Sequence, residues 1–202
     1  MNSDPQQLIL FVFDLDGTLA DFAVDWGDVR KRLRRLLATE EPLTPLLPSL
    51  EALVLDPALK RRAYELIDAV ELTSAQTFDR DDELVRLFSR LKARGRKIAL
   101  VTLQGRPAAE EALARLGIRR YVDLIISRDE CTVREEQIAR SLTILGVPPS
   151  RSVVIADREA DMAAARRLGC VAVAVGVRPG LSGDFRAKSS ADILKVLGME
   201  DE

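Results

Sequence analysis

Four aspartates in two short groups have the residue types and the spacing to bind a divalent cation. Asp14 and Asp16 are one residue apart, whereas Asp157 and Asp161 are four residues apart and would share one face of a helix. Carboxylates gathered in one pocket repel one another, by roughly 4 kcal/mol for two charges about 4 Å apart at an effective dielectric of 20. A hard cation removes this cost, and an all-oxygen site with room for water suits Mg²⁺ better than zinc. A phosphate is the natural ligand beside Mg²⁺ and helix N-termini.

Each aspartate group comes directly after an apolar run that is typical of a buried strand. Residues 8–13 are all apolar, form a run too short to span a membrane, and end at Asp14. Comparable runs end at Thr102, Ser127 and Asp157. Because the carboxyl ends of parallel strands lie at one edge of a sheet, these side chains should converge. Each also has a simpler interpretation: residues 14–18 could form a turn, Thr102 could be a β-branched strand end, and Asp157 could be a helix N-cap.

Strands and helices alternate through the second part of the chain. Apolar runs predict strands over 97–102, 122–126, 152–157 and 171–175, and amphipathic segments between them predict helices. Each return to a parallel strand needs a crossover, so the pattern predicts an α/β fold, a doubly wound parallel sheet with helices on both faces. The glycine-rich, polar segment 176–190 is expected to be a mobile loop, followed by a last helix over 191–197.

Only helical signals are found between residues 21 and 78. Apolar residues recur at steps of three and four from Trp26 to Ala38, three prolines then break the chain, and Asp56-Pro57 opens another helix. We therefore expect a small α-helical insertion over 21–78, directly after the first strand, and an α/β core made of 1–20 and 79–202. Trp26 could close over the site, although packing within the insertion is the simpler role.

Composition limits the classes of function. The chain has 202 residues, 47% of them hydrophobic, and a net charge of -2, which is typical of a soluble globular protein and argues against a general nucleic-acid binder. The N-terminal residues contain no signal peptide or membrane span, so we expect a cytoplasmic protein with no membrane partner. Cys131 and Cys170 lack Cys-x-x-Cys spacing and are expected to be free thiols. Histidine is absent, so catalysis must use carboxylates, hydroxyls and guanidiniums.

Three motifs resemble those of the haloacid dehalogenase-like phosphohydrolases, in the same order and on the same elements. They are the segment Asp14-Leu15-Asp16-Gly17-Thr18-Leu19, Thr102 at a strand end, and the segment Asp157-Arg158-Glu159-Ala160-Asp161. The helical insertion is similar to the small cap of the phosphoglycolate phosphatase-like members. The resemblance implies a Rossmann-like core, Mg²⁺ as the cofactor, and a small phosphorylated metabolite as the partner.

The resemblance also implies roles for individual residues. Asp14 would attack phosphorus to give an aspartyl-phosphate, and Asp16 would protonate the leaving oxygen and later activate water. The metal ligands would be Asp14, Asp16 through its main-chain carbonyl, Asp157 and Asp161. The phosphate-binding residues would be Gly17, Thr102, Leu103 and Arg134.

The sequence departs from the family pattern at two positions. The family carries a lysine between the threonine and the last acidic motif, but no lysine lies between Thr102 and Asp157. Arg134 is the best substitute and Arg128 the second. A planar guanidinium nevertheless differs from a compact ammonium, and an arginine beside two glutamates is usually a surface residue. Ala156 stands where the family has a glycine before the last motif.

These features predict a Mg²⁺-dependent phosphatase that hydrolyses a small-molecule phosphomonoester and works as a monomer or homodimer. A phosphomutase or phosphotransferase would use the same aspartyl-phosphate and pass the phosphoryl group to a hydroxyl other than water. The absent lysine also leaves open a weakly active or non-catalytic phosphate-binding scaffold. The presence of both Asp14 and Asp16 weighs against a scaffold, because a protein that only binds phosphate has no need of both.

Overall fold

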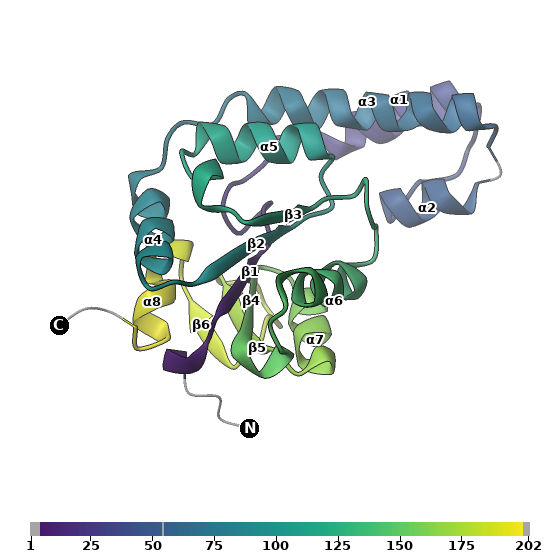
Figure 1. The fold of residues 1–202 in the computed structure, drawn as a ribbon. Helices are drawn as coiled ribbons and strands as arrows, with labels where there is room; N and C mark the ends of the chain where they lie inside the picture. The colour runs from purple at the N-terminus through teal and green to yellow at the C-terminus, as the bar shows by residue number, and fades with distance from the viewer. Residues whose placement is uncertain (1–4, 54, 200–202) are drawn as a thin grey trace.

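The computed structural model describes residues 5–53 and 55–199, and these contain one parallel sheet of six strands (Figure 1). The strand order is β3-β2-β1-β4-β5-β6, which places β1 between β2 and β4. The strands are β1 (Leu10–Phe13), β2 (Lys97–Val101), β3 (Leu124–Ile126), β4 (Ser152–Ala156), β5 (Val171–Val175) and β6 (Phe185–Ala187). The predicted α/β class with a doubly wound parallel sheet is confirmed.

Helices cover both faces of this sheet, which is why its central strands are apolar throughout. Leu10 and Val12 pack on the face covered by α6 and α7, and Phe11 and Phe13 pack on the face covered by α4 and α5; all four are 0% exposed. Phe13 contacts Phe88 of α4, with ring centroids 4.8 Å apart. The helices are α4 (Asp82–Ala93), α5 (Arg106–Arg115), α6 (Arg134–Leu145), α7 (Glu159–Leu168) and α8 (Ile193–Val196). Short 3₁₀ helices span Pro5–Gln7, Arg119–Tyr121, Pro149–Arg151 and Ser190–Asp192.

Three further helices lie outside these layers and form a cap (Figure 1). They are α1 (Trp26–Leu37), α2 (Leu46–Ala52) and α3 (Pro57–Ala75). The four-residue spacing of Val29, Leu33 and Leu37 puts these side chains on one face of α1. They join Ala63 and Ile67 of α3 in an apolar cluster that is separate from the two clusters of the sheet. The cap therefore has its own small core.

Two connections join the cap to the sheet, and they run side by side. Phe22 in the first and Phe78 in the second meet edge to face, with ring centroids 5.0 Å apart. The main-chain N–H of Ala23 donates to Oγ of Ser74 at 2.9 Å. Beyond these connections, α3 packs along α5 of the core (Figure 1). The expected division of the chain at residues 21 and 78 stays a prediction.

Three local expectations were wrong. Segment 176–190 is not only a loop, because β6 lies within it and pairs with residues 173–175 of β5. The proline-rich segment contains α2, since Pro45 precedes that helix and Pro48 lies in its first turn, where a main-chain N–H is not needed. The third strand begins at Leu124 and not at residue 122, because the chain makes a 3₁₀ turn just before it.

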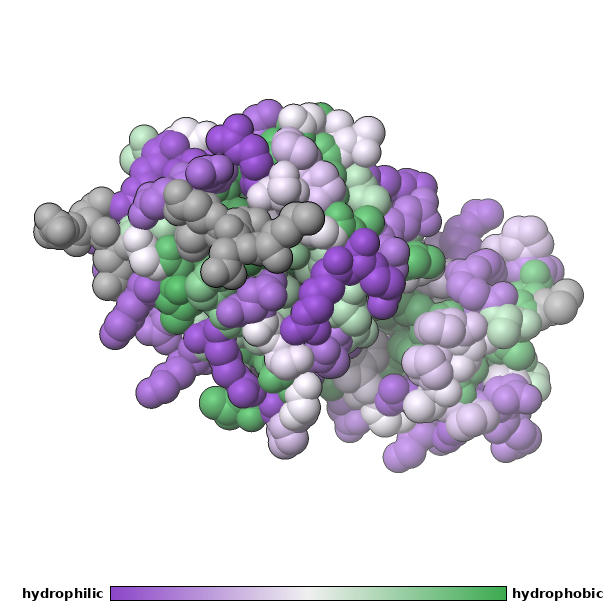
Figure 2. Space-filling model, turned by 90° about the horizontal axis from the view of Figure 1, so that it is seen from below, coloured by the Kyte–Doolittle hydropathy of each residue, from purple (hydrophilic) through white to green (hydrophobic). Residues whose placement is uncertain are grey.

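Polar side chains dominate the described surface. Figure 2 shows hydrophilic and apolar residues interspersed over the face seen from below. Three large apolar residues are exposed in the described ranges: Val133, Ile144 and Val177. No helix within residues 5–53 and 55–199 combines the length and the apolar character needed to cross a membrane.

Candidate active site

The carboxyl edge of the sheet brings together polar residues that are far apart in the sequence. Asp14, Thr102 and Asp157 directly follow β1, β2 and β4, and they are buried with 3%, 0% and 2% exposure. Their positions follow from the parallel register, in which Phe13 pairs with both Leu100 and Ile155. Asp14 extends this pairing, because its N–H donates to the carbonyl of Ile155 at 3.0 Å.

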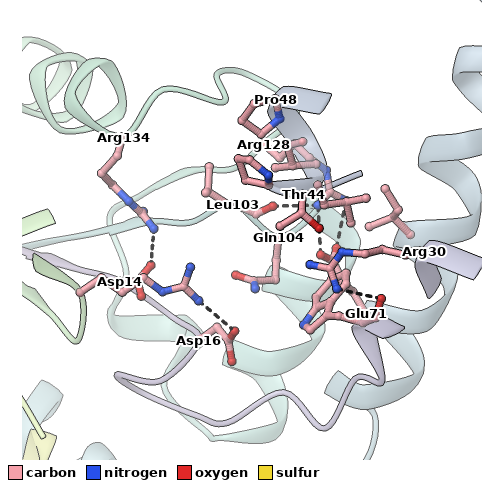
Figure 3. A pocket seen from close by; sticks show the side chains of 16 residues that line it. Asp14, Asp16, Arg30, Thr44, Pro48, Glu71, Leu103, Gln104, Arg128 and Arg134 are labelled. Carbon is pink, nitrogen blue, oxygen red and sulfur yellow. Dashed lines mark hydrogen bonds and ion pairs between the residues drawn. The ribbon is translucent and has the colours of Figure 1, made fainter. Parts of the chain in front are cut away.

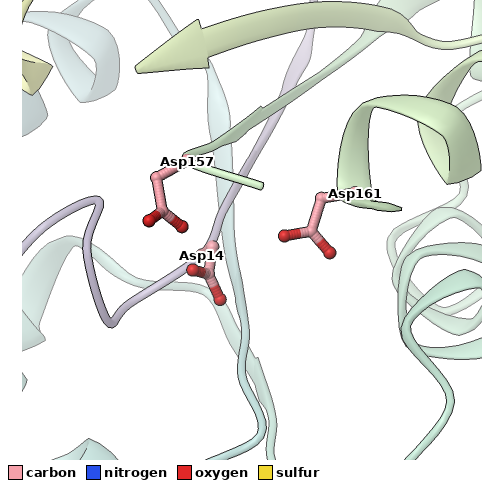
Figure 4. Close-up of side chains that lie close together, drawn as sticks. All are labelled: Asp14, Asp157 and Asp161. Atoms are coloured by element: carbon pink, nitrogen blue, oxygen red, sulfur yellow. The ribbon is translucent and has the colours of Figure 1, made fainter. Parts of the chain in front are cut away.

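Three of the four predicted acidic residues form a buried cluster (Figure 4). One carboxylate oxygen from each of Asp14, Asp157 and Asp161 lies within 4.8 Å of the others. Within the described chain, no group donates a hydrogen bond to either oxygen of Asp157 or to Oδ2 of Asp161, although Oδ2 of Asp157 has an ion pair with Arg178. Buried carboxylate oxygens without hydrogen bonds are costly, so this donor set fits a hard divalent cation.

The charges around this cluster affect its protonation. Burial raises the pKa of Asp161 to about 6, opposed by the nearby guanidinium of Arg134. Burial also raises the pKa of Asp157, opposed by Arg178. Nη2 of Arg178, an exposed residue after β5, lies 2.7 Å from Oδ2 of Asp157. A divalent cation would favour the ionised form of each carboxyl group.

Asp16 lies beside this cluster, but its side chain is not part of it. Oδ1 of Asp16 accepts a hydrogen bond from the N–H of Phe22 at 3.0 Å, and Oδ2 is 3.6 Å from Nη2 of Arg158. Burial raises the pKa of Asp16, opposed by the hydrogen bond from Phe22 and the charge of Arg158. A carboxyl group with a raised pKa is suited to donate a proton.

Gly17 allows the first loop to pass close to the acidic cluster. Its φ is +82°, in the region that favours glycine. A Cβ at this position would lie 2.7 Å from Cγ of Asp157. Both the backbone conformation and the lack of space therefore require glycine here.

Arg134, the first residue of α6, is part of the cluster and is not a solvated surface residue. Its side chain is 14% exposed, with Nη2 2.6 Å from Oδ1 of Asp14 and Nε 2.8 Å from Oδ1 of Asp161. Nη1 donates to the carbonyl of Val101 at 2.6 Å and to Oε1 of Gln137 at 3.1 Å. One guanidinium thus joins carboxylates from two different elements, in the region where the family carries its lysine.

Two residues that the sequence analysis did not select support Thr102: Gln104 in the loop after β2, and Gln137 on α6. The hydroxyl of Thr102 donates to Oε1 of Gln104, and the main-chain N–H of Gln104 donates to Oγ1 of Thr102 at 3.2 Å. Nε2 of Gln137 donates to the carbonyl of Thr102 at 2.8 Å and to that of Cys131 at 2.7 Å. Neither glutamine belongs to a motif or follows a recognisable spacing, so no sequence signal distinguishes them from other glutamines.

Comparison with known proteins identifies the family. The family described as haloacid dehalogenase-like hydrolase matches residues 11–175. The chain belongs to this family. It is 26% identical to a plasmid-encoded phosphoglycolate phosphatase of Cupriavidus necator, over 92% of this chain and 90% of that protein. It is also 26% identical to the phosphoglycolate phosphatase of Aquifex aeolicus, over 93% of this chain and 96% of that protein. The expected resemblance to phosphoglycolate phosphatase-like phosphohydrolases is confirmed.

Two further matches have different names from these phosphatases. The tyrosine-protein kinase PtkA of Mycobacterium tuberculosis is 28% identical, over 96% of this chain and 70% of that protein. The crystal structure of β-phosphoglucomutase from Clostridium difficile has a TM-score of 0.75 at 20% identity, covering 95% and 97% of the two chains. The chain has the fold of the family, and together with the two phosphoglycolate phosphatases the family match shows a phosphoric monoester hydrolase.

A cavity of about 380 Å³ lies between the cap of this haloacid dehalogenase-like hydrolase and the carboxyl edge of its sheet (Figure 3). Asp14, Asp16 and Arg134 line its floor, and Leu103 lies on its wall. The cap contributes the following lining residues: Trp26, Arg30, Thr44, Pro45, Leu46, Leu47, Pro48, Ile67 and Glu71. Trp26 both lines the cavity and packs against the cap's apolar cluster, so the two roles considered for it are compatible.

Arg128, the second candidate for the missing lysine, points to a different partner. Its side chain is 3% exposed and forms ion pairs with Asp68 and Glu71 of α3, not with Asp14. Figure 3 shows Arg128 beside Glu71 and away from Asp14. Of the two arginines, only Arg134 contacts the cluster, so the geometry favours Arg134 in the place of the lysine.

Proposed function

We propose that this chain is a Mg²⁺-dependent phosphatase that hydrolyses a small phosphomonoester through an aspartyl-phosphate on Asp14. The observation that carries the proposal is the position of Asp14. It lines a cavity under the cap, close to the buried acids Asp157 and Asp161 and paired with the guanidinium of Arg134. A phosphoryl group entering this cavity would meet a nucleophile, a cation site and a fixed positive charge together.

The first chemical step is transfer of the phosphoryl group to the enzyme. A carboxylate oxygen of Asp14 attacks phosphorus, and the bond between phosphorus and the leaving oxygen breaks. Asp16 donates its proton to that oxygen, which its raised pKa favours. The dephosphorylated product leaves, and Asp14 carries the phosphoryl group.

The second step returns the enzyme to its starting state. Asp16, now ionised, takes a proton from a water molecule, whose oxygen attacks phosphorus. The bond from phosphorus to Asp14 breaks, and inorganic phosphate is released. Mg²⁺, held by Asp14, Asp157, Asp161 and the main-chain carbonyl of Asp16, would supply charge neutralisation for the phosphoryl oxygens.

The remaining predicted residues would bind and orient the phosphate. Arg134 neutralises phosphoryl oxygens and holds Asp14 in position for attack. The hydroxyl of Thr102 and the main chain at Gly17 and Leu103 would donate to the other oxygens. We also retain as proposals a cytoplasmic location and a monomeric or homodimeric state.

A second candidate is transfer of the phosphoryl group to a hydroxyl other than water. The relative named tyrosine-protein kinase PtkA supports keeping this candidate. The distinction depends on whether water or a second substrate molecule reaches the aspartyl-phosphate, so the two activities differ in their products.

A substrate panel with product analysis tests both candidates. Sugar phosphates, 2-phosphoglycolate and nucleotide monophosphates would be incubated with Mg²⁺ or with EDTA, and the products followed by phosphorus NMR. We expect inorganic phosphate to form only with Mg²⁺. In D14N, we expect neither release of phosphate nor an acid-stable phosphoenzyme. The exposed neighbour variant D21N is the matched control. Turnover in D14N would exclude the covalent mechanism, and a phosphorylated product in place of free phosphate would establish the second candidate.

A further inference from the structure

A buried ion pair joins the cap to the core away from the acidic cluster. Nη1 and Nη2 of Arg128 lie 3.0 and 2.9 Å from Oε1 and Oε2 of Glu71. The two side chains are 3% and 2% exposed, and Asp68 contacts the same guanidinium from α3. Arg128 follows β3 in the core, whereas Glu71 lies on α3 of the cap, so this pair crosses the boundary between the two parts.

The same two side chains hold the loop that follows Thr102. Nη1 of Arg128 donates to the carbonyl of Leu103 at 2.7 Å, and the N–H of Gly105 donates to Oε2 of Glu71 at 3.0 Å. The main-chain N–H of Arg128 also donates to the carbonyl of Gln104 at 3.2 Å. The segment 103–105 is therefore bonded at both ends to one ion pair, half of which belongs to the cap.

Gly105 leaves the space that this arrangement needs. Its φ is -63°, so any residue could adopt the backbone conformation. A Cβ there would nevertheless lie 3.0 Å from Nη2 of Arg128 and 3.2 Å from Cγ of Asp68. The loop approaches the cap carboxylates so closely that a larger residue would push them away.

A buried ion pair contributes little to the net free energy of unfolding. Removing both groups from water costs several kcal/mol each, and apolar residues of similar volume often hold two elements together equally well. What the pair provides is directional bonding, because a guanidinium and a carboxylate meet in a fixed planar geometry. Here that geometry is shared with the main chain of residues 103–105.

We propose that Arg128 and Glu71 are positioning residues that place the phosphate-binding loop only when α3 is docked on the core. This inference rests on the proposed function for its kinetic consequence, but its structural part does not. Both side chains line the cavity, but neither contacts Asp14, Asp157 or Asp161; their positioning role acts through Leu103 and Gly105 on the neighbouring Thr102. When α3 packs on the core, the same contacts therefore place the phosphate-binding loop.

Two variants separate a positioning role from a merely structural one. E71Q keeps the size of the side chain but weakens the charge pairing, and R128M/E71M replaces both charges with apolar groups that can pack. The double change should leave a folded protein with a docked cap, because no unpaired charge remains at this contact except that of Asp68, which is 35% exposed. The control is E51Q, which removes an exposed ion pair with Lys60 inside the cap.

The readouts are kinetics and amide hydrogen exchange. We expect both variants to lower kcat roughly 10- to 100-fold with a smaller change in KM. We also expect them to speed exchange at the amide of Gly105 roughly tenfold in the metal-free protein, whereas E51Q changes neither quantity. Quenching of Trp26, the only tryptophan of the chain, reports whether the cap stays docked.

The outcomes distinguish this inference from the proposed function. A double variant that folds, keeps wild-type kcat and protects Gly105 would overturn the positioning role. If the wild-type protein hydrolyses no substrate, the proposed function fails. The exchange measurement at Gly105 then decides alone whether Arg128 and Glu71 position the loop. If E71Q leaves the exchange of Gly105 unchanged, the inference fails even when the phosphatase activity is confirmed.

Discussion

Arg134 and Asp14 form a buried ion pair with 2.6 Å between Nη2 and Oδ1, although 120 residues separate them in the sequence. Asp14 directly follows the central strand β1, and Arg134 is the first residue of α6. The pair therefore depends on the parallel sheet, which places the end of β1 beside the start of that helix. Several measurable consequences follow from this arrangement and from the loops around it.

Replacement of Arg134 should reduce the rate of the chemical step. R134A leaves Asp14 without its positive partner, and we expect kcat to fall roughly 10²- to 10³-fold, as for the loss of one charge-stabilising donor. R134K should recover part of this loss, because it keeps the charge but cannot contact Asp14 and Asp161 with one planar group. Steady-state kinetics would measure both. R140A, an exposed residue of the same helix, is the control, and an unchanged kcat in R134A would contradict the assignment.

Substitution of Gly17 should weaken metal binding as well as stability. In G17A, the positive φ costs about 1 kcal/mol, and the added Cβ also displaces Asp157. G95A is a matched control, because Gly95 has a φ of +69° but no heavy atom within 4 Å of the added Cβ. Thermal unfolding should show losses in both variants, whereas calorimetric titration with Mg²⁺ should show weaker binding only in G17A. Equal Mg²⁺ affinities would mean that Asp157 is not a ligand.

The metal-free protein should lose stability as the pH rises through the pKa of Asp161. This carboxyl group titrates at about 6 in the folded state, above its ordinary value of 3.8, mainly because it is buried. Its contribution is therefore complete below about pH 4 and is lost as the pH rises through 6. In EDTA, the unfolding midpoint of the wild-type protein should fall between about pH 4 and pH 6 relative to that of D161N and should then stay level. A difference in unfolding midpoint between the wild-type protein and D161N that does not change with pH would contradict a raised pKa of Asp161.

The two cysteines should differ in reactivity. Cys170 is 6% exposed, and burial raises the pKa of its thiol to about 12. Cys131 is partly exposed, and burial raises its pKa as well. Because the thiolate is the reactive form, iodoacetamide at mild alkaline pH should label Cys131 slowly and Cys170 only after unfolding. Mass spectrometry of C131S, with and without denaturant, would check this; labelling of native C131S would show that Cys170 is accessible.

The sheet and most of the cluster could be predicted from the sequence because their signals are local. The unbroken apolar run before Asp14 and the similar run before Asp157 specify buried parallel strands, and parallel strands carry their ends to one edge. By contrast, β6 contains only three residues and depends on pairing with β5, so it has little signal of its own.

The contacts that could not be predicted are those between residues distant in sequence. Arg128 and Glu71 are 57 residues apart, and each taken alone has the charge of an ordinary surface residue. Gln104 and Gln137 support Thr102 only after the loops have folded together. The position of the Asp16 side chain outside the cluster likewise depends on the N–H of Phe22, which lies beyond the motif.

The adjacent placement of the two cap connections has a consequence for how this enzyme could be re-engineered. Phe22 and Phe78 bring the entry and exit of the inserted segment into direct contact, so the segment is attached to the core at one place. A short bridge could span the gap with little loop-closure entropy, and an unrelated segment with equally close ends could be grafted there. The α/β core could then carry different grafted caps, each chosen to bind a different phosphorylated compound.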